Sequence, residues 1–246
     1  ALNYGYGLFE TILYENGKIY FFEDHLKRLS NSCQELNIPL PDLGFINESS
    51  IHELVEDNGL KKDSVIIKLM YLPITDEDGW NTLIRVNKYK RDTKETSVLV
   101  LNKVRLNYFY KHKSLSYMQN HHLLLRSEGH DEILFINKDQ NVIEGSYTNV
   151  IAIKDNILHF VGGNNDCLFG IMQQNIFKDH RLFGFKKIEA LDEGFSKEFL
   201  QSCDEVILTN SLKIASNVRS ILFIDDKIEY DSCKISTLIR DHYLKG

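Results

Sequence analysis

The sequence has no excess of positive charge and no long apolar run. Its 29 basic residues are outnumbered by 35 acidic ones, which gives a formal net charge of −6, and it has no basic tail that could displace counterions from phosphates. A nucleic-acid partner is therefore not expected. No apolar run approaches the roughly 18 to 20 residues that cross a bilayer, and the N-terminus lacks a positive segment followed by an apolar one. We therefore expect a cytoplasmic protein with no membrane partner.

Cysteine is also scarce. The four cysteines lie far apart and form neither a CxxC pair nor a cluster with metal-ligand spacing: Cys33, Cys167, Cys203 and Cys233. Free cysteine behaves as a small hydrophobic residue, so we expect reduced, partly buried thiols and no metal site. With 246 residues, 43% of them hydrophobic, the chain can bury a core in one large domain or two small ones. Because Gly5-Tyr6-Gly7 follows Ala1 almost at once, we expect a segment before Ala1.

The N-terminal part predicts a hairpin followed by a helix. Asn16-Gly17 separates β-rich runs at about residues 8 to 14 and 18 to 22, which is a strong hairpin signal. Asp24 can then cap a helix that ends before Pro39. A polar stripe runs beside the apolar face of this helix and consists of His25, Arg28 and Ser32.

The rest of the chain alternates strands with a few helices. Apolar runs predict strands near 64–72, 81–90 and 96–104, and alternating runs over 131–160 predict a β meander with turns at 138–141 and 154–156. Helices are predicted at 48–58, from Ser114 to Ser127, at 170–184, near 194–202 and at the C-terminus. We therefore predict an α+β fold with antiparallel sheets, divided into domains 1–107 and 108–246.

Four positions stand out, although each has an ordinary explanation when it is taken alone. Lys113 and Arg28 are typical of solvated surface cations. Glu144 lies on a strand before Gly145, where a close backbone approach invites a partner for the carboxylate, but it is also typical of an edge glutamate that faces water. Gly170 opens a helix whose free amides could hold a phosphate, yet it is equally an ordinary glycine turn.

Taken together and in order, five segments resemble the class IV, fold-type IV pyridoxal-phosphate enzymes: "YGYGLFETILYENGKIYFFEDHLKRL", "HKSLSYMQN", "DEILFINKDQNVIEGSYTNVI", "DCLFGIMQQ" and "DEVILTNSLKIASNV". This family includes branched-chain and D-amino-acid aminotransferases and 4-amino-4-deoxychorismate lyase. The resemblance covers nearly the whole chain from Gly5. It implies a small N-terminal α/β domain, a larger C-terminal domain with a β pseudo-barrel and flanking helices, bound pyridoxal 5′-phosphate and a homodimer.

The resemblance also implies residue roles. In the K-x-L-x-Y pattern, Lys113 is the Schiff-base lysine and Tyr117 lies near the cofactor hydroxyl. A lysine with an ordinary pKa of about 10.4 must lose basicity to act near neutrality, and burial beside a cation has that effect. Lys111 is the exposed neighbour, and His112, His121 and His122 keep ordinary interpretations.

Further cofactor contacts follow from the other segments. Arg28 of "HLKRL" resembles the arginine that binds the phosphate, and Glu144 of "IEGSYTN" resembles the carboxylate that keeps the pyridine nitrogen protonated. The remaining phosphate contacts implied by the resemblance are the amides of Ile171 and Met172 and the hydroxyl of Ser211.

Three features favour the lyase, which eliminates pyruvate and leaves 4-aminobenzoate, a step of folate biosynthesis. "LTNSLK" and "DCLFGIM" resemble lyase segments, with Asn210 as a substrate contact, and Lys68 lies where lyases place a lysine that meets a substrate carboxylate. The alternative is a class IV aminotransferase acting on D-amino or branched-chain amino acids. A third possibility is a binding or regulatory protein that keeps the fold, which the presence of Lys113, Arg28 and Glu144 argues against.

The chain departs from the family pattern at several points. Tyr6 replaces a common aspartate, and Met172 replaces the threonine of aminotransferases. "LPITDEDGWN" lacks the Arg-Gly-rich segment that usually supplies a second cation, a role for which Lys213 and Arg219 are candidates.

Overall fold

The computed structural model describes residues 5–74, 79–91, 96–104, 111–127, 129–162 and 167–245. Packing divides the chain into two units, one made of Ala1–Arg91 and His112–Tyr117 and the other of Asp92–Lys111 and Met118–Gly246. The expected domain boundary near residue 108 stays a prediction. In the structure the strand Thr96–Val104 belongs to the second unit, and the segment around Lys113 belongs to the first.

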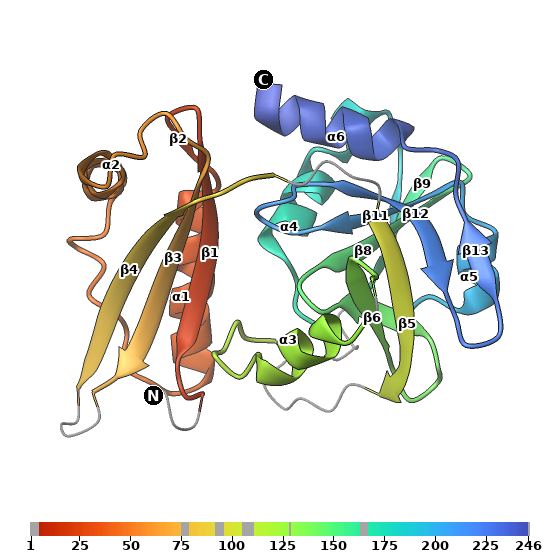
Figure 1. Cartoon of the computed structure of the whole chain (residues 1–246), viewed down its shortest axis with the longest axis horizontal. Coiled ribbons are helices and arrows are strands. Elements are labelled where there is room, and N and C mark those ends of the chain that lie inside the picture. Colours follow the sequence, from red (N-terminus) through yellow and green to blue (C-terminus); the bar gives the residue numbers. More distant parts are fainter. Residues whose placement is uncertain are drawn as a thin grey trace. The chain divides into compact units, whose positions relative to one another are not determined.

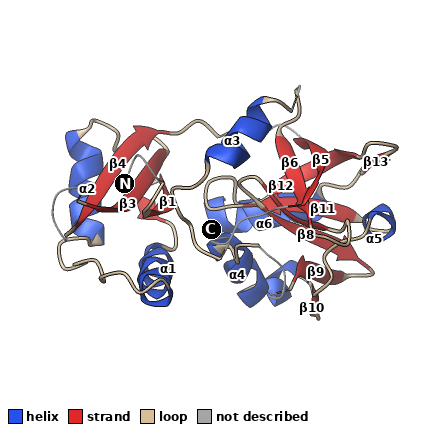
Figure 2. Cartoon of the chain, turned by 90° about the horizontal axis from the view of Figure 1, so that it is seen from below, coloured by secondary structure: helices blue, strands red, loops and turns tan. Residues whose placement is uncertain are grey.

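The first unit is an antiparallel sheet in the order β2-β1-β3-β4 with two helices. Its elements are β1 (Leu8–Glu15), β2 (Lys18–Ile19), α1 (Phe22–Glu35), α2 (Glu48–Asp57), β3 (Val65–Pro73) and β4 (Trp80–Lys88). Both helices cover one face of the sheet (Figures 1 and 2), and their buried side chains form one apolar core with alternate residues of the strands. Because strand side chains alternate between faces, the second face carries the other set of residues.

The predicted hairpin is present, but the following helix starts earlier than expected. Asn16 and Gly17 both have positive φ, 54° and 76°, as a tight two-residue hairpin turn requires. The strand expected over 18–22 ends at Ile19, because Phe21 adopts a left-handed conformation and α1 begins at Phe22. Asp24 therefore lies in the first helical turn and is not the cap.

The helix predicted from Ser114 to Ser127 is shorter than expected. Ser114 forms an isolated antiparallel bridge with Leu8, and the Leu115 amide donates to the Gly7 carbonyl at 2.9 Å. These backbone bonds hold the segment in an extended conformation beside β1, so its amides are used by the strand and cannot start a helix. The helix α3 begins only at Met118 and ends at Leu125.

The second unit is built on a curled nine-stranded sheet in the order β10-β9-β8-β11-β12-β5-β6-β7, with β13 paired to β12. Its strands are β5 (Thr96–Val104), β6 (Glu132–Ile136), β7 (Val142–Gly145), β8 (Asn149–Lys154), β9 (Ile157–Val161), β10 (Ile188–Leu191), β11 (Glu205–Thr209), β12 (Ser216–Leu222) and β13 (Lys227–Glu229). The prediction of antiparallel sheets is confirmed for the first unit but is wrong for the second, because β5 pairs in parallel with β6 and β12, and β9 with β10. These strands are distant in sequence, and local patterns do not encode such pairings.

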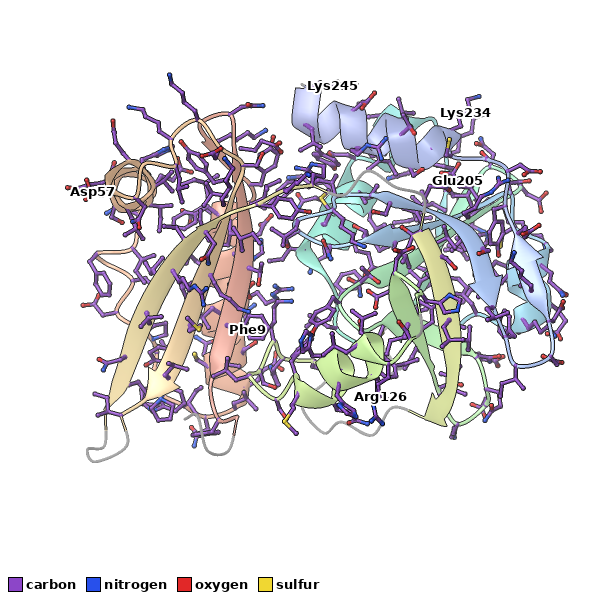
Figure 3. The ribbon with its side chains drawn as sticks, in the orientation of Figure 1. Phe9, Asp57, Arg126, Glu205, Lys234 and Lys245 are labelled. Atoms are coloured by element: carbon purple, nitrogen blue, oxygen red, sulfur yellow. The ribbon has the colours of Figure 1, made fainter. Side chains whose placement is uncertain are left out.

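Helices pack around this sheet as α3, α4 (Ile171–Lys178), η1 (His180–Phe183), α5 (Lys197–Gln201) and α6 (Lys234–Lys245). The carboxylate of Glu205 on β11 accepts hydrogen bonds from the amides of Ile235 and Ser236 at 3.0 and 2.7 Å, and so anchors the start of α6 (Figure 3). The predicted turn at 154–156 is present, with Asp155 and Asn156 at positive φ. No helix in the described ranges is long and apolar enough to cross a membrane.

Candidate functional site

The segment after His112 places the amine of Lys113 beside β1. The Phe9 amide donates to the Lys113 carbonyl at 2.8 Å, and the amine lies 5.0 Å from the centre of the Phe9 ring and 5.6 Å from that of Tyr117. Burial lowers the pKa of Lys113 to about 8, and the positive charge of Arg28 acts in the same direction, while Glu10 opposes both. Lys113 therefore has the depressed basicity that a nucleophile or base near neutrality needs.

Tyr117 packs against the same Phe9 ring as Lys113. Its amide donates to the Leu115 carbonyl at 2.8 Å, and its ring meets the Phe9 ring edge-on, with 5.5 Å between the centroids. Phe9, which Figure 3 labels on β1, therefore contacts both the tyrosine and the lysine of the K-x-L-x-Y pattern.

Arg28 projects from α1 toward a carboxylate on β1. Its Nε and one Nη2 hydrogen donate to the two oxygens of Glu10 at 2.7 and 2.5 Å. His25, one helical turn earlier, shares Glu10 through Nδ1 at 2.6 Å. The polar stripe predicted on α1 is thus real, and two of its members meet at one buried carboxylate.

Sequence reasoning missed Glu10, although a signal for it exists. On β1, Leu8, Ile12 and Tyr14 point into the core beneath the helices, and Glu10 shares their parity. A carboxylate at a core-facing position needs a charged or hydrogen-bonding partner, and the polar stripe on the next helix supplies one.

Lys68 lies on the other face of the same sheet. Its amine is 4.5 Å from the centre of the Phe9 ring, and its neighbour across the β3–β4 ladder is Arg85. Burial lowers the pKa of Lys68, and the charges of Lys113 and Arg85 lower it further. Arg85 donates from Nε and Nη2 to the side-chain oxygen of Asn87 at 3.3 and 3.2 Å.

Arg85 was not singled out from the sequence, because only the register of β3 against β4 places it opposite Lys68. It provides a second cation beside Lys68 although the Arg-Gly-rich segment is lacking. Residues 75–78 of that segment lie outside the described residues. Of the other two candidates, Arg219 donates to the Tyr230 carbonyl at 2.7 Å and to the Asp231 carboxylate at 2.9 Å on the surface of the second unit.

In the second unit, Glu144 is buried at the end of β7. One of its oxygens accepts a hydrogen bond from the Leu168 amide at 3.0 Å. The following Gly145 has no room for a side chain, because an added Cβ would lie 2.2 Å from Oγ1 of Thr148. The predicted close approach of the backbone at Gly145 is confirmed.

The loop that leads into α4 is held by Asn149 of β8. Gly170 is the N-cap residue of the helix and has no capping side chain, and an added Cβ at Gly170 would lie 2.0 Å from Oδ1 of Asn149. Asn149 also donates to the Leu168 carbonyl at 2.5 Å. Ile171 and Met172 are buried in the first turn, where backbone amides have no partner within the helix and favour an anion.

The loop after β11 is shaped by Asn210. Its Oδ1 accepts hydrogen bonds from the amides of Leu212 and Lys213 at 3.0 and 2.8 Å, and its Nδ2 donates to the Tyr147 carbonyl at 3.3 Å. The loop closes at Ile214, a buried β-branched residue with φ of 64°, which is a strained conformation. Most of the Asn210 amide is therefore used within the protein, and half-buried Ser211 follows it in this loop.

Two further contacts hold the turn after Glu144. Glu132, a buried residue at the start of β6, accepts hydrogen bonds from this turn, and His121 of α3 lies 2.9 Å from the hydroxyl of Tyr147. Neither role was expected from the sequence, because both contacts join segments more than ten residues apart. The predicted residues therefore fall into two groups, each described within its own unit. Among the described residues no group of three or more His, Cys, Asp or Glu side chains could hold a metal ion.

Comparison with known proteins places this geometry in context. A probable branched-chain-amino-acid aminotransferase of Rickettsia typhi is 22% identical over 100% of this chain and 88% of its own. The aminodeoxychorismate lyase of Bacillus subtilis is 24% identical over 85% of this chain and 75% of its own. Among solved structures, a hypothetical aminotransferase from Mycobacterium tuberculosis in its apo form covers 100% of this chain and 91% of its own, with a TM-score of 0.86 and 20% identity.

The structural likeness confirms the expected α+β, fold-type IV architecture. The model of the amino-transferase class IV family matches residues 7–221, which is most of the chain and includes every residue discussed above as a candidate. The chain therefore belongs to the class IV aminotransferase family, whose cofactor is pyridoxal phosphate.

Proposed function

We propose that the chain is a pyridoxal-phosphate-dependent lyase that releases pyruvate from 4-amino-4-deoxychorismate and leaves 4-aminobenzoate, as in folate biosynthesis. The observation that carries the choice of substrate is the neighbouring pair of cations on one sheet face, Lys68 and Arg85. The proposed substrate carries carboxylates, and basic side chains are their natural partners. The lyase of Bacillus subtilis among the relatives supports the same choice.

The chemistry of the described residues fits the cofactor. Lys113 has a depressed pKa, which suits covalent capture of an aldehyde. At the start of α4, Gly170 has no room for a side chain, and the first backbone amides of the helix suit a phosphate. In the proposal Arg28, Ile171, Met172 and Ser211 hold the phosphate, Tyr117 lies near the ring hydroxyl, and Glu144 faces the ring nitrogen.

Each side chain has one task in the proposed reaction. When bound, pyridoxal phosphate withdraws electrons from the substrate carbon that carries the amine. The freed amine of Lys113 takes the proton from that carbon, and its pKa of about 8 lets it act near neutral pH. Glu144 keeps a proton on the ring nitrogen by its negative charge. Lys68 binds a substrate carboxylate with Arg85 beside it, and Asn210 contacts the substrate with the amide hydrogen that Tyr147 does not take.

The second candidate is an aminotransferase for branched-chain or D-amino acids. It is favoured by the relative from Rickettsia typhi, which aligns over 100% of this chain. This enzyme would use the same lysine to move the proton, the cofactor would take up the amino group, and the product would be a keto acid. The homodimer implied by the family resemblance belongs to both proposals, and light scattering of the purified protein measures it.

One assay separates the two reactions. The purified enzyme loaded with pyridoxal phosphate is given aminodeoxychorismate alone and, separately, D-alanine or L-leucine with 2-oxoglutarate. We expect pyruvate and 4-aminobenzoate from the first mixture without any keto-acid acceptor. Amino transfer in the second mixture with no product in the first would overturn the lyase proposal. Lys113→Ala should abolish the bound-cofactor absorbance and activity, whereas Lys111→Ala should leave both intact.

A second variant tests the cation pair. Arg85→Ala should raise the KM for aminodeoxychorismate about tenfold, because a charge-assisted hydrogen bond contributes roughly 1.5 to 3 kcal/mol, and kcat should change little. Lys88→Ala is the matched control, since Lys88 is a cation of the same strand whose parity places it on the opposite face. An unchanged KM in Arg85→Ala would remove Arg85 from the proposed site.

A further inference from the structure

The buried carboxylate of Glu10 has no role in the proposed chemistry, yet it touches two groups next to Lys113. Its side chain is 1% exposed, and burial alone would raise its pKa. The charge of Arg28, the interaction with His25 and the hydrogen bonds from both outweigh burial and bring the pKa to about 2. Glu10 is therefore a fixed negative charge inside the first unit at all ordinary pH values.

Glu10 leaves Arg28 able to bind a second anion. A guanidinium has five N–H groups, and Glu10 takes two of them, on Nε and Nη2. The remaining three lie on the far end of the group, and the Arg28 side chain is 13% exposed. Because a bidentate bond fixes the plane of the guanidinium, Glu10 determines where these three hydrogens point.

His25 does not compete for this role. Burial lowers the pKa of His25, and Arg28 and Lys113 lower it further, while Glu10 raises it. Nδ1 of His25 lies 2.6 Å from one oxygen of Glu10 and donates to this ionised carboxylate, so His25 helps to orient it.

The backbone of Lys113 is bound to the strand that carries Glu10. Its carbonyl accepts the amide of Phe9, the residue before Glu10. The charged and titratable groups that face its amine are Glu10 of β1, Arg28 and His25 of α1, Lys68 of β3 and the Tyr117 ring. Glu10 is the only negative charge in this set of described neighbours.

We propose that Glu10 is a positioning residue, which holds the guanidinium of Arg28 in one orientation for an anionic ligand and places a compensating negative charge beside the amine of Lys113. The inference rests on the proposed function for the identity of that ligand, the phosphate group of the cofactor. The charge beside Lys113 is a property of the chain alone.

The test compares Glu10→Gln with Glu10→Asp. The glutamine variant can fold, because its amide oxygen still accepts one hydrogen from Arg28 and its amide nitrogen can donate to the other tautomer of His25. In the cofactor-free protein, the pKa of Lys113 is read from the pH dependence of its reductive methylation by mass spectrometry. We expect Glu10→Gln to lower it by about one unit and Glu10→Asp to leave it nearly unchanged.

Cofactor affinity supplies the second measurement. Both variants disturb the bidentate bond, so both should weaken pyridoxal phosphate binding about tenfold. The matched control is Glu15→Gln, on the same strand, where Glu15 pairs with Arg91, and it should change neither quantity. An unchanged Lys113 titration in Glu10→Gln, or wild-type cofactor affinity in both Glu10 variants, would overturn the proposal.

The two proposals fail in different ways. If the wild-type protein binds no pyridoxal phosphate, the proposed function is wrong, but the titration of Lys113 still decides whether Glu10 supplies the charge. If the wild type binds the cofactor and the titration does not move, only the role of Glu10 is wrong.

Discussion

Each unit contains a buried glutamate whose negative charge is compensated in a different way, Glu10 in the first unit and Glu132 in the second. In the first unit Glu10 faces a full positive charge on Arg28 and a hydrogen bond from His25. In the second unit Glu132 accepts hydrogen bonds from backbone amides and hydroxyls, with the donors Ile133 N, Ser146 N, Ser146 Oγ, Tyr147 N and Thr148 Oγ1. Both side chains are almost completely buried, at 1% and 2%.

The difference shows what each carboxylate can do. Most donors around Glu132 belong to one turn, and their hydrogen bonds to Glu132 fix the backbone that follows Glu144. These donor hydrogens are used within the protein. Glu10 instead holds a cation that keeps three further hydrogens. A carboxylate that accepts hydrogen bonds from neutral donors is therefore suited to fixing the conformation of a loop. A carboxylate that pairs with an arginine is suited to orienting the positive charge of that arginine.

The largest expected effect comes from removing the carboxylate of Glu132, which accepts hydrogen bonds from neutral donors. Glu132→Ala removes the acceptor of several buried donors at once, so the free energy of unfolding should fall by about 4 kcal/mol. Urea unfolding followed by circular dichroism measures it. Glu56→Ala is the control, because Glu56 is an exposed carboxylate paired with Lys61, and such pairs contribute less than about 1 kcal/mol. A loss for Glu132→Ala as small as that of the control would contradict the role given to Glu132.

A smaller effect on stability, visible only at acidic pH, is expected for Glu10, the carboxylate that pairs with Arg28. The pKa of Glu10 falls from 4.5 to about 2 on folding, so its ionised form stabilises the folded state above pH 4.5, and this stabilisation disappears as the pH falls through 2. The stability advantage of the wild type over Glu10→Gln should therefore shrink by about 3 kcal/mol across that range. Urea titrations at several pH values measure the difference, and a constant gap between the two proteins would show that Glu10 is not held ionised by Arg28.

Local features of the fold were predictable from the residues. The Asn16-Gly17 turn and the turn at 154–156 need positive φ, and asparagine, aspartate and glycine tolerate it best. The close approach at Gly145 followed from a glycine beside a strand carboxylate. The helix predicted over Ser114 to Ser127 is present, but its predicted start was wrong, because Ser114 forms a bridge with Leu8, a contact that no local signal indicates.

The candidate site divides in the same way. Resemblance to the family supplied Lys113, Arg28 and Glu144, each of which is an ordinary residue when considered alone. Arg85 and Glu10 came from the structure, because the first depends on strand register and the second on what α1 brings to β1.

By itself the sequence determined the turns at 16–17 and 154–156, the family and the chemical types available at the site, since these depend on residue identity, on alternation and on spacing. Only the tertiary structure decided which charges are neighbours. Coulomb interactions fall with distance and strengthen with burial, and both quantities are set by packing between segments far apart in the chain. Packing of this kind explains the lowered pKa of Lys113 and the position of Arg85 as the cross-strand neighbour of Lys68. It also explains the hydrogen bonds from Arg28 to Glu10.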